Sequence, residues 1–420
     1  MNPDPVPKLV FCFPYRGVGG VSLLFLRVAE ELARRGLAEC LLVDYADGFM
    51  ASHRREGLTT LLEYRDDRDV PLPPDGVAIF QSMTPWSIYP SLRMAPEMRL
   101  LFWNCYLFNL IPALPGLRGP MQAYPVLADA LLATILRRYR SQMRTFTRLL
   151  LERHSLAFMD RGNVATTERY LGLRVPDPSY LPIAAVSQGE RPQREPRDVT
   201  RRGLRIAWLG RIVDFKFHVL DRALRDLDRL QPRLGFPMSV TVIGEGDHEA
   251  ALKQRCARLR HLDVRFQAFL APDRVDHFLG EEVDLLLAMG TSALEGAKLG
   301  VPTILLDASY RTVPDGYLYR WLHEAAGFSL GEVLGPEHFV PGNTSLEDHL
   351  ACLRKDHATV AEQALRYFER NHAVKSVAEQ VLERCAQARC TNGDLEAAGL
   401  LDRGVVYPVF TFLRSALVRA

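Results

Sequence analysis

The sequence predicts two doubly wound, Rossmann-like α/β domains, each a parallel sheet covered by helices on both faces. Its 420 residues exceed what one hydrophobic core usually supports. Apolar runs alternate with amphipathic helical segments, and a polar stretch near residue 190 interrupts this alternation. Uninterrupted apolar runs are typical of parallel strands whose sheet is buried on both faces. We therefore expect two such domains in series.

The first domain is expected over residues 1–186, and it begins with a strand, a glycine loop and a helix. The loop is residues 17–20 and the helix residues 23–35, which end before Gly36. Apolar runs predict strands at residues 9–13, 41–43, 77–80, 100–103 and 155–158. A polar linker with two prolines follows at residues 187–203.

The second domain is expected over residues 204–373, where the same alternation starts again. Predicted strands are residues 204–209, 239–243, 264–269, 283–287 and 301–306. Predicted helices are residues 214–230, 248–262 and 292–299. The pattern from residue 345 to about residue 389 is helical throughout.

Composition excludes several classes of protein. The 52 basic and 50 acidic residues give a net charge of +2, which offers no case for nucleic-acid binding. A hydrophobic share of 48% is that of an ordinary globular protein. The seven cysteines are scattered without a C-x2-C pair, which argues for a reducing compartment and against structural zinc.

The first glycine loop allows two interpretations. Gly19 and Gly20 lie between a strand and a helix, where backbone N–H groups can approach an anion. Asp44 ends the next strand, where the ribose-binding acid of a dinucleotide site would lie, but Ser22 occupies the third glycine position of that motif. A dinucleotide site and a simple glycine turn both remain open.

The second domain has a pair of cations where its first strand ends. Gly210 and Arg211 leave this strand, and Lys216 follows five residues after Arg211. Two cations at the carboxyl end of a strand can hold a diphosphate. Another glycine turn, which begins at Gly244, ends the next strand. Solvated charges at a helix start are the alternative for the cations.

A short helix between two strands completes the candidate site. It begins with Gly290, Thr291 and Ser292 and ends before Gly300. Ser292 and Glu295 have the spacing of a capping box, which requires no ligand. The same amides can also bind phosphate, and Glu295 can bind ribose hydroxyls.

These motifs together resemble the donor half of GT-B glycosyltransferases, especially the retaining family that builds surface polysaccharides and lipid-linked glycans. The motifs are G-R-x4-K, V-I-G-x-G, V-x-F-x-x-F and E-G-A-x-x-G-V-P, in that order. The resemblance implies two domains that face a cleft, with helices of residues 374–420 crossing back to the first domain. It implies that Arg211 and Lys216 bind the donor diphosphate and act in catalysis, and that Gly210 and Gly244 contact the donor. It also implies that Glu295 binds ribose and that residues 290–292 face the phosphates. The Gly19 and Gly20 loop would then lie on the acceptor side.

The chain departs from that family at two places. Leu287 stands where the family usually has a second acid. The first domain has no histidine near the ends of its middle strands, where the candidates are Gln81, Ser82, Asn104 and Cys105. None of these is a good general base at neutral pH, so catalysis would depend on stabilising the leaving group.

We expect no metal and no cofactor beyond the nucleotide-sugar substrate. Asp67 and Asp69 have D-x-D spacing but lie in a polar loop. Asp315, Arg320 and His323 follow the last predicted strand and are candidates for contact with the donor sugar.

Three segments offer membrane contact. Residues 132–154 form a basic amphipathic pattern, residues 100–117 carry no charge, and residues 405–413 are apolar and aromatic. For residues 132–154, a helix packed on the core with its arginines in solvent is the slightly favoured alternative. The apolar run at residues 9–13 is too short for a signal-peptide core. We expect a cytoplasmic protein with peripheral contact at the inner face of the plasma membrane.

The sequence therefore predicts a transferase that moves sugar from a nucleotide donor to a glycan or lipid-linked acceptor. Two alternatives stay open. One is an NAD-dependent oxidoreductase that uses residues 17–20 and Asp44. The other is a catalytically silent GT-B scaffold that binds a partner enzyme.

Overall fold

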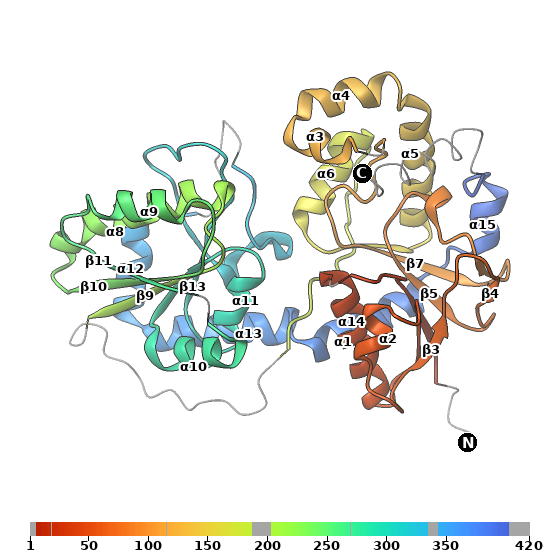
Figure 1. The fold of residues 1–420 in the computed structure, drawn as a ribbon, viewed down its shortest axis with the longest axis horizontal. Coiled ribbons are helices and arrows are strands. Elements are labelled where there is room, and N and C mark those ends of the chain that lie inside the picture. Colours follow the sequence, from red (N-terminus) through yellow and green to blue (C-terminus); the bar gives the residue numbers. More distant parts are fainter. Residues whose placement is uncertain are drawn as a thin grey trace. The chain divides into compact units, whose positions relative to one another are not determined.

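A computed structural model describes residues 6–17, 19–114, 116–186, 203–268, 270–334 and 343–402. The chain forms two compact units (Figure 1). The N-terminal unit comprises residues 1–184 together with 374–420, and the C-terminal unit comprises residues 185–373. Residues 405–413, one of the three segments considered for membrane contact, lie outside the described residues.

A six-stranded parallel sheet organises the N-terminal unit. Its order is β3-β2-β1-β5-β7-β8, and every neighbouring pair is parallel. The strands are β1 (Lys8–Cys12), β2 (Glu39–Asp44), β3 (Thr60–Glu63), β5 (Val77–Gln81), β7 (Arg99–Asn104) and β8 (Leu156–Phe158). Two short strands pair separately, β4 (Val70–Pro71) and β6 (Leu92–Arg93).

Helices cover both faces of this sheet, as its uninterrupted apolar strands require. Along β1, Leu9 and Phe11 belong to one buried cluster, and Val10 and Cys12 belong to the other. The first cluster includes α1 and α14, and the second includes α5. The helices are α1 (Gly20–Arg34), α2 (Phe49–His53), α3 (Arg118–Ala123), α4 (Pro125–Ala133), α5 (Arg137–Glu152), α6 (Arg161–Leu171), α14 (Val374–Gln387) and α15 (Asn392–Ala397), with a 3-10 turn at η1 (Pro85–Ser87).

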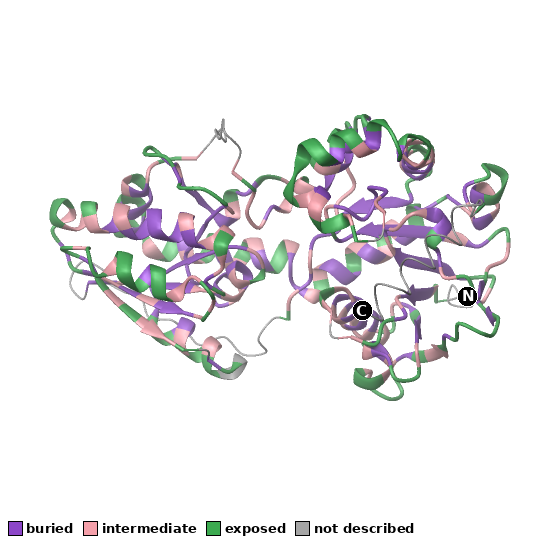
Figure 2. Ribbon diagram, turned by 45° about the horizontal axis from the view of Figure 1, so that its top comes forward, coloured by how far each residue is buried: buried purple, intermediate pink, exposed green. Residues whose placement is uncertain are grey.

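The C-terminal unit repeats this plan with the order β11-β10-β9-β12-β13-β14. Its neighbouring strands are parallel except for the pair formed by β13 and β14. The strands are β9 (Leu204–Leu209), β10 (Met238–Ile243), β11 (Asp263–Gln267), β12 (Leu285–Ala288), β13 (Thr303–Leu305) and β14 (Arg320–Trp321). Figure 2 shows the sheets of both units as largely buried.

The helices of the C-terminal unit lie between and after these strands. They are α8 (Asp214–Leu234), α9 (Glu249–Cys256), α10 (Pro272–Glu282), α11 (Thr291–Ala297), α12 (Leu346–Lys355) and α13 (His357–Asn371), with 3-10 turns η2 (Leu322–Glu324) and η3 (Ala326–Phe328). The predicted fold class, two Rossmann-like α/β domains as in GT-B glycosyltransferases, is confirmed by the strand orders of the two units.

The structure favours core packing over membrane contact for residues 100–117 and for most of residues 132–154. Residues 132–154 are not one helix, because Thr134 has a non-helical backbone and separates α4 from α5. The apolar side of α5, including Met143 and Phe146, is fully buried. The uncharged stretch from residue 100 comprises β7 and a loop whose large side chains are mostly buried, so it offers little surface to a membrane.

Strand order also shows where each unit is suited to bind a ligand. In both sheets the first strand is central, the next two lie on one side of it, and the later strands lie on the other. The order therefore reverses between β1 and β5 in one unit and between β9 and β12 in the other. Ligands of open α/β sheets bind beyond the carboxyl ends of the strands at such a reversal.

Candidate functional site

The candidate site of the C-terminal unit lies at this reversal point. Residues 210–213 connect β9 to α8, and residues 289–290 connect β12 to α11. Because β9 and β12 are parallel neighbours, both loops leave the same edge of the sheet. The loop after β10 lies beside them, since the Gly210 amide donates a hydrogen bond to the Ile243 carbonyl over 3.1 Å.

Lys216 and Ser292 converge on the backbone of Gly210. A Cβ added to Gly210 would lie 3.2 Å from Lys216 Nζ and 3.7 Å from Ser292 Oγ. The same point is 3.6 Å from the Trp208 ring. Residues from α8 and α11, about 75 positions apart in the sequence, therefore approach one place at the end of β9.

Trp208 is a supporting residue that the sequence reasoning missed. Its indole Nε1 donates a hydrogen bond to the Gly210 carbonyl over 3.1 Å, and its ring centroid lies 5.9 Å from Lys216 Nζ. The side chain is fully buried, so it gives the loop a rigid base. The sequence feature that could have indicated this role is an aromatic residue with a donor N–H two positions before Gly210.

The two cations have no compensating carboxylate within the part of the chain that the structure describes. No ion pair joins Arg211 or Lys216 to an acid there. Arg211 is exposed, whereas Lys216 is half-buried. Burial, and secondly the positive charge of Arg211, lower the pKa of the Lys216 ammonium. The loop thus carries excess positive charge that an anion can neutralise.

Gly244 and Gly246 allow the loops after β9 and β10 to pack against each other. A Cβ on Gly244 would lie 2.2 Å from the Gly210 carbonyl oxygen, and one on Gly246 would lie 2.3 Å from the Ile212 carbonyl oxygen. Their φ angles are +133° and +159°. Gly244 therefore packs directly against the backbone of the Gly210 loop. Its predicted contact with the donor stays a prediction.

The start of α11 differs from the predicted capping box. Gly290, with φ of +65°, is the N-cap residue, and its amide donates to the Leu330 carbonyl over 2.6 Å. Ser292 is the second residue of the helix, and no side chain caps this end. The capping-box interpretation is wrong because the N-cap is Gly290, two residues before Ser292. The Ser292 side chain instead lies near Gly210, while Thr291 is exposed.

Glu295 is held one turn into α11. Its Oε2 lies 2.5 Å from Lys298 Nζ, and the same ammonium lies 2.8 Å from Asp276 Oδ1. Because Glu295 shares Lys298 with a second acid, its carboxylate remains able to accept hydrogen bonds from hydroxyl groups. Its predicted role in ribose binding stays a prediction.

Two of the further candidates for sugar contact are engaged elsewhere. The Arg320 guanidinium is buried and pairs with Asp307, and Asp315 pairs with Arg222. His323 lies parallel to Trp321, with 6.1 Å between ring centroids. Its Nδ1 is buried and has no hydrogen-bond partner within the described part of the chain, and burial lowers its pKa to about 4.

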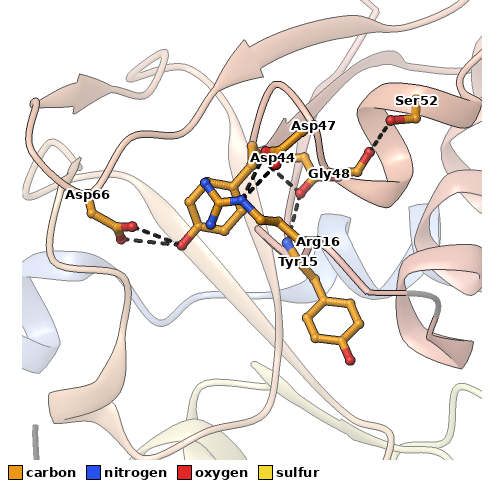
Figure 3. Close-up of polar contacts among 8 residues, drawn as sticks. Tyr15, Arg16, Asp44, Asp47, Gly48, Ser52 and Asp66 are labelled. Carbon is orange, nitrogen blue, oxygen red and sulfur yellow. Dashed lines mark hydrogen bonds and ion pairs between the residues drawn. The ribbon is translucent and has the colours of Figure 1, made fainter. Parts of the chain in front are cut away.

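Asp44 in the N-terminal unit has a structural role. It is fully buried, and its carboxylate accepts hydrogen bonds from the backbone amides of four residues, Tyr15, Tyr45, Met50 and Ala51. Figure 3 shows Asp44 beside Tyr15. Burial raises its pKa, and these amides oppose the shift. Asp44 therefore has no free edge for a ribose. The dinucleotide interpretation is wrong at this residue.

The glycine loop that precedes α1 is closed by its own side chains. Gly19 is the N-cap of α1, and its carbonyl accepts a hydrogen bond from Ser22 Oγ over 2.9 Å. Ser22 is fully buried, and the Tyr15 ring lies within 3.2 Å of a Cβ placed on Gly19. Gly20 is open, with no atom within 4 Å of its added Cβ. The acceptor-side role of Gly19 and Gly20 remains a prediction.

A cavity of about 330 Å³ lies beside this loop and is rich in charge. Arg16 pairs with Asp47 over 2.9 Å and covers the Tyr45 ring at 3.6 Å (Figure 3). Asp67 lines the cavity, whereas Asp69 pairs with Arg93. No group of acids, cysteines and histidines that can hold a metal ion is found among the residues described.

The strand ends β5 and β7 contain two buried polar side chains. Asn104 is fully buried, and neither its amide atoms nor the buried Ser82 hydroxyl has a hydrogen-bond partner among the residues that the structure describes. Burial raises the pKa of the Cys105 thiol well above its ordinary value. Gln81 is half-buried at the end of β5. None of these side chains can act as a strong base at neutral pH.

Comparisons with known proteins give similar solved structures but no relative by sequence. No protein-family model matches the chain, and no curated protein matches it by sequence. Among solved structures, WaaG, a glycosyltransferase involved in lipopolysaccharide biosynthesis, is 15% identical over 90% of this chain and 99% of that one, with a TM-score of 0.44. A glycosyltransferase from Rickettsia africae ESF-5 is 10% identical over 97% and 98%, with a TM-score of 0.44.

The N-terminal domain of Candida albicans trehalose-6-phosphate phosphatase is 12% identical over 91% of this chain and 97% of that one, with a TM-score of 0.48. At these identities and TM-scores, the matches carry no argument about this chain. What this chain does is therefore argued from its own residues.

Proposed function

We propose that this chain is a glycosyltransferase that moves a sugar from a nucleotide-sugar donor to a glycan or lipid-linked acceptor in surface polysaccharide synthesis. One observation carries the proposal: Lys216 and Ser292 converge on Gly210 at the strand reversal of the C-terminal unit. Arg211 adds a second cation there, and neither cation has an acidic partner among the described residues. A diphosphate fits this charge and this position.

The proposed chemistry uses these cations to stabilise the leaving group. In the reaction, the bond between the sugar C1 and the phosphate oxygen breaks, and its electron pair remains on the nucleoside diphosphate. The acceptor hydroxyl oxygen forms the new bond to C1 and gives its proton to the departing diphosphate. Lys216 and Arg211 would neutralise the charge that develops on the diphosphate. We propose this role for them in place of a metal ion, and no further cofactor.

Glu295 is proposed to bind the ribose of the donor. It lies one helical turn beyond Ser292, whose hydroxyl group lies near Gly210. If it accepts hydrogen bonds from the ribose, wild-type protein should bind a nucleoside diphosphate roughly tenfold more tightly than the 2′-deoxy form. Glu295→Gln should reduce this preference. If wild type and Glu295→Gln prefer the nucleoside diphosphate over its 2′-deoxy form equally, Glu295 does not bind the ribose.

The acceptor is proposed to bind the N-terminal unit near Gly19 and Gly20, at the carboxyl end of β1. This is the strand reversal of that sheet, the corresponding place to the donor site. We propose that the reaction takes place on the cytoplasmic side of the plasma membrane.

A thermal-shift titration with UDP, GDP, CMP and NAD tests the proposal. We expect stabilisation by a nucleoside diphosphate, abolished in Arg211→Ala and in Lys216→Ala. A matched control is Lys253→Ala with Arg255→Ala, a pair of exposed cations on α9. Hydrolysis of nucleotide sugars would then establish turnover. A response to NAD that survives both site substitutions would contradict the proposal.

A catalytically silent scaffold is a second candidate, and one observation favours it. Leu287 is fully buried in β12, so no acid faces the donor from this position. Binding of a nucleoside diphosphate without hydrolysis or transfer of any nucleotide sugar would support the scaffold.

A further inference from the structure

Helix α4 and its two ends expose large apolar side chains to solvent. Val126 is 81% exposed, Tyr124 and Ile135 are each 66% exposed, and Leu127 is 37% exposed. These four residues lie within twelve positions of the sequence, after the carboxyl end of β7. In Figure 1 the segment lies with α3 and α5 beside the sheet of the N-terminal unit. We call these four residues the α4 surface.

The exposure follows from the composition of α4, which is apolar on both sides. Ala128 and Leu132 are buried and hold the helix against the core of the unit. Val126, Ala130 and Ala133 are spaced as i, i+4 and i+7, so they share a face, and all three are exposed. The one charged residue on this face is Asp129, which pairs with Arg169. A helix on an ordinary soluble surface has polar residues on that face. The outer face of α4 is therefore suited to an apolar environment.

Positive charge borders this apolar face. Residues 118–151 contain six arginines and a single acid, Asp129, although the whole chain is nearly neutral. Asp129 is paired with Arg169 over 3.3 Å. Arg137 and Arg138 follow Ile135 directly, are exposed, and form no ion pair within the described residues. Apolar side chains and unpaired arginines thus occur side by side.

This combination is suited to the surface of an anionic lipid bilayer. Apolar side chains enter the region between headgroups and acyl chains, where a tyrosine ring also prefers to lie. Arginines beside them attract lipid phosphates. Within the described residues, the structure contains no helix long and apolar enough to span a bilayer.

We propose that the α4 surface is a peripheral membrane-binding site for anionic lipid headgroups. Val126 and Ile135 enter the bilayer interface, and Arg137 and Arg138 contact the phosphates. The site overlaps the indicated segment 132–154 at Ile135, Arg137 and Arg138, but its apolar face lies on α4, because the apolar side of α5 is buried. The inference is independent of the proposed transferase activity, because it requires no catalytic step.

Vesicle flotation with the full-length protein tests this site. We expect the protein to float with vesicles that contain phosphatidylglycerol, to float far less with pure phosphatidylcholine vesicles, and to be released by high salt. Val126→Glu with Ile135→Glu should weaken partitioning at least about tenfold. Arg137→Glu with Arg138→Glu should abolish the preference for anionic vesicles.

Matched controls use exposed residues outside the α4 surface. Val333→Glu alters an apolar residue of similar exposure in the C-terminal unit, and Arg258→Glu with Arg260→Glu alters two exposed arginines there. Both should float like wild type. Circular dichroism and the thermal transition of each variant would verify folding.

Two results would overturn the proposal. One is equal flotation of wild type and the Val126→Glu, Ile135→Glu variant, or no flotation of either. The other is a lipid-free dimer that this variant dissociates, together with no binding to vesicles, because the α4 surface would then be a contact between copies of the chain.

Discussion

The ammonium group of Lys216 lies against the backbone of Gly210, 3.2 Å from the point where a Cβ on that glycine would stand. Gly210 has φ of +148°, and the Ser292 hydroxyl lies on the same side of it. The absence of a side chain at residue 210 therefore leaves space where a cation and a hydroxyl group meet. The account of the site depends on this space being open to an anion.

Gly210→Ala should weaken ligand binding strongly and destabilise the fold only moderately. The new methyl group would displace Lys216, so we expect nucleoside diphosphate affinity to fall at least about tenfold, with a stability loss of roughly 1–3 kcal/mol from backbone strain. Isothermal titration and urea unfolding measure the two effects. Gly316→Ala is the control, because its φ is +84° and no atom lies within 4 Å of its added Cβ. Equal loss of affinity in both variants would contradict the account.

Lys216→Met should stabilise the ligand-free protein while it removes diphosphate binding. The pKa of Lys216 is lowered in the native state, so its protonated form disfavours folding at neutral pH. We expect the thermal transition at pH 7 to rise by roughly 2–4 °C, and the difference to shrink as the pH approaches 10.5, the ordinary pKa of lysine. Lys253→Met, on the surface of α9, should show no such rise. A lower transition temperature for Lys216→Met than for wild type at pH 7 would contradict the inference that the Lys216 ammonium is an unpaired cation.

Asp44→Ala should destabilise the N-terminal unit without any effect on nucleotide binding. It would leave four backbone amides without their acceptor in a buried place. We expect a loss of about 3 kcal/mol or more in urea unfolding. Asp47→Ala removes a nearby exposed acid that pairs with Arg16, and it should cost no more than about 1 kcal/mol. NAD binding that depends on Asp44 would restore the dinucleotide interpretation.

His323 should make the C-terminal unit sensitive to acid. Its native pKa of about 4 lies below the ordinary 6.5, so the neutral ring is the form that the native state favours. Its contribution is complete above pH 6.5 and is lost as the pH falls toward 4. Between pH 7.5 and pH 4, the free energy of unfolding of wild type should fall by up to about 3 kcal/mol more than that of His323→Gln. Parallel pH profiles of the two proteins would contradict this assignment.

Strand positions and the place of the candidate site could be predicted from the sequence. Apolar runs such as β9 and β12 are recognisable because both faces of a parallel sheet are buried, and their carboxyl ends share an edge. This shared edge is sufficient to predict from the sequence that Gly210 and Ser292 lie near each other.

Other features depend on contacts between distant residues and could not be predicted. The donors to Asp44 come from Tyr15, Met50 and two further residues that only the folded loops bring together. The break between α4 and α5 was hidden, because apolar residues on both sides, such as Leu132 and Leu136, belong to the same core. Periodicity therefore continued across a helix end, and the exposed face of α4 was missed.

The most direct test of the central claim is calorimetric titration of the preferred nucleoside diphosphate into wild type and into an Arg211→Met, Lys216→Met double variant. If the two cations hold the diphosphate, the wild type should bind it and the folded double variant should bind it at least about a hundredfold more weakly. Unchanged affinity in the double variant, or no binding of any nucleoside diphosphate by wild type, would contradict the claim.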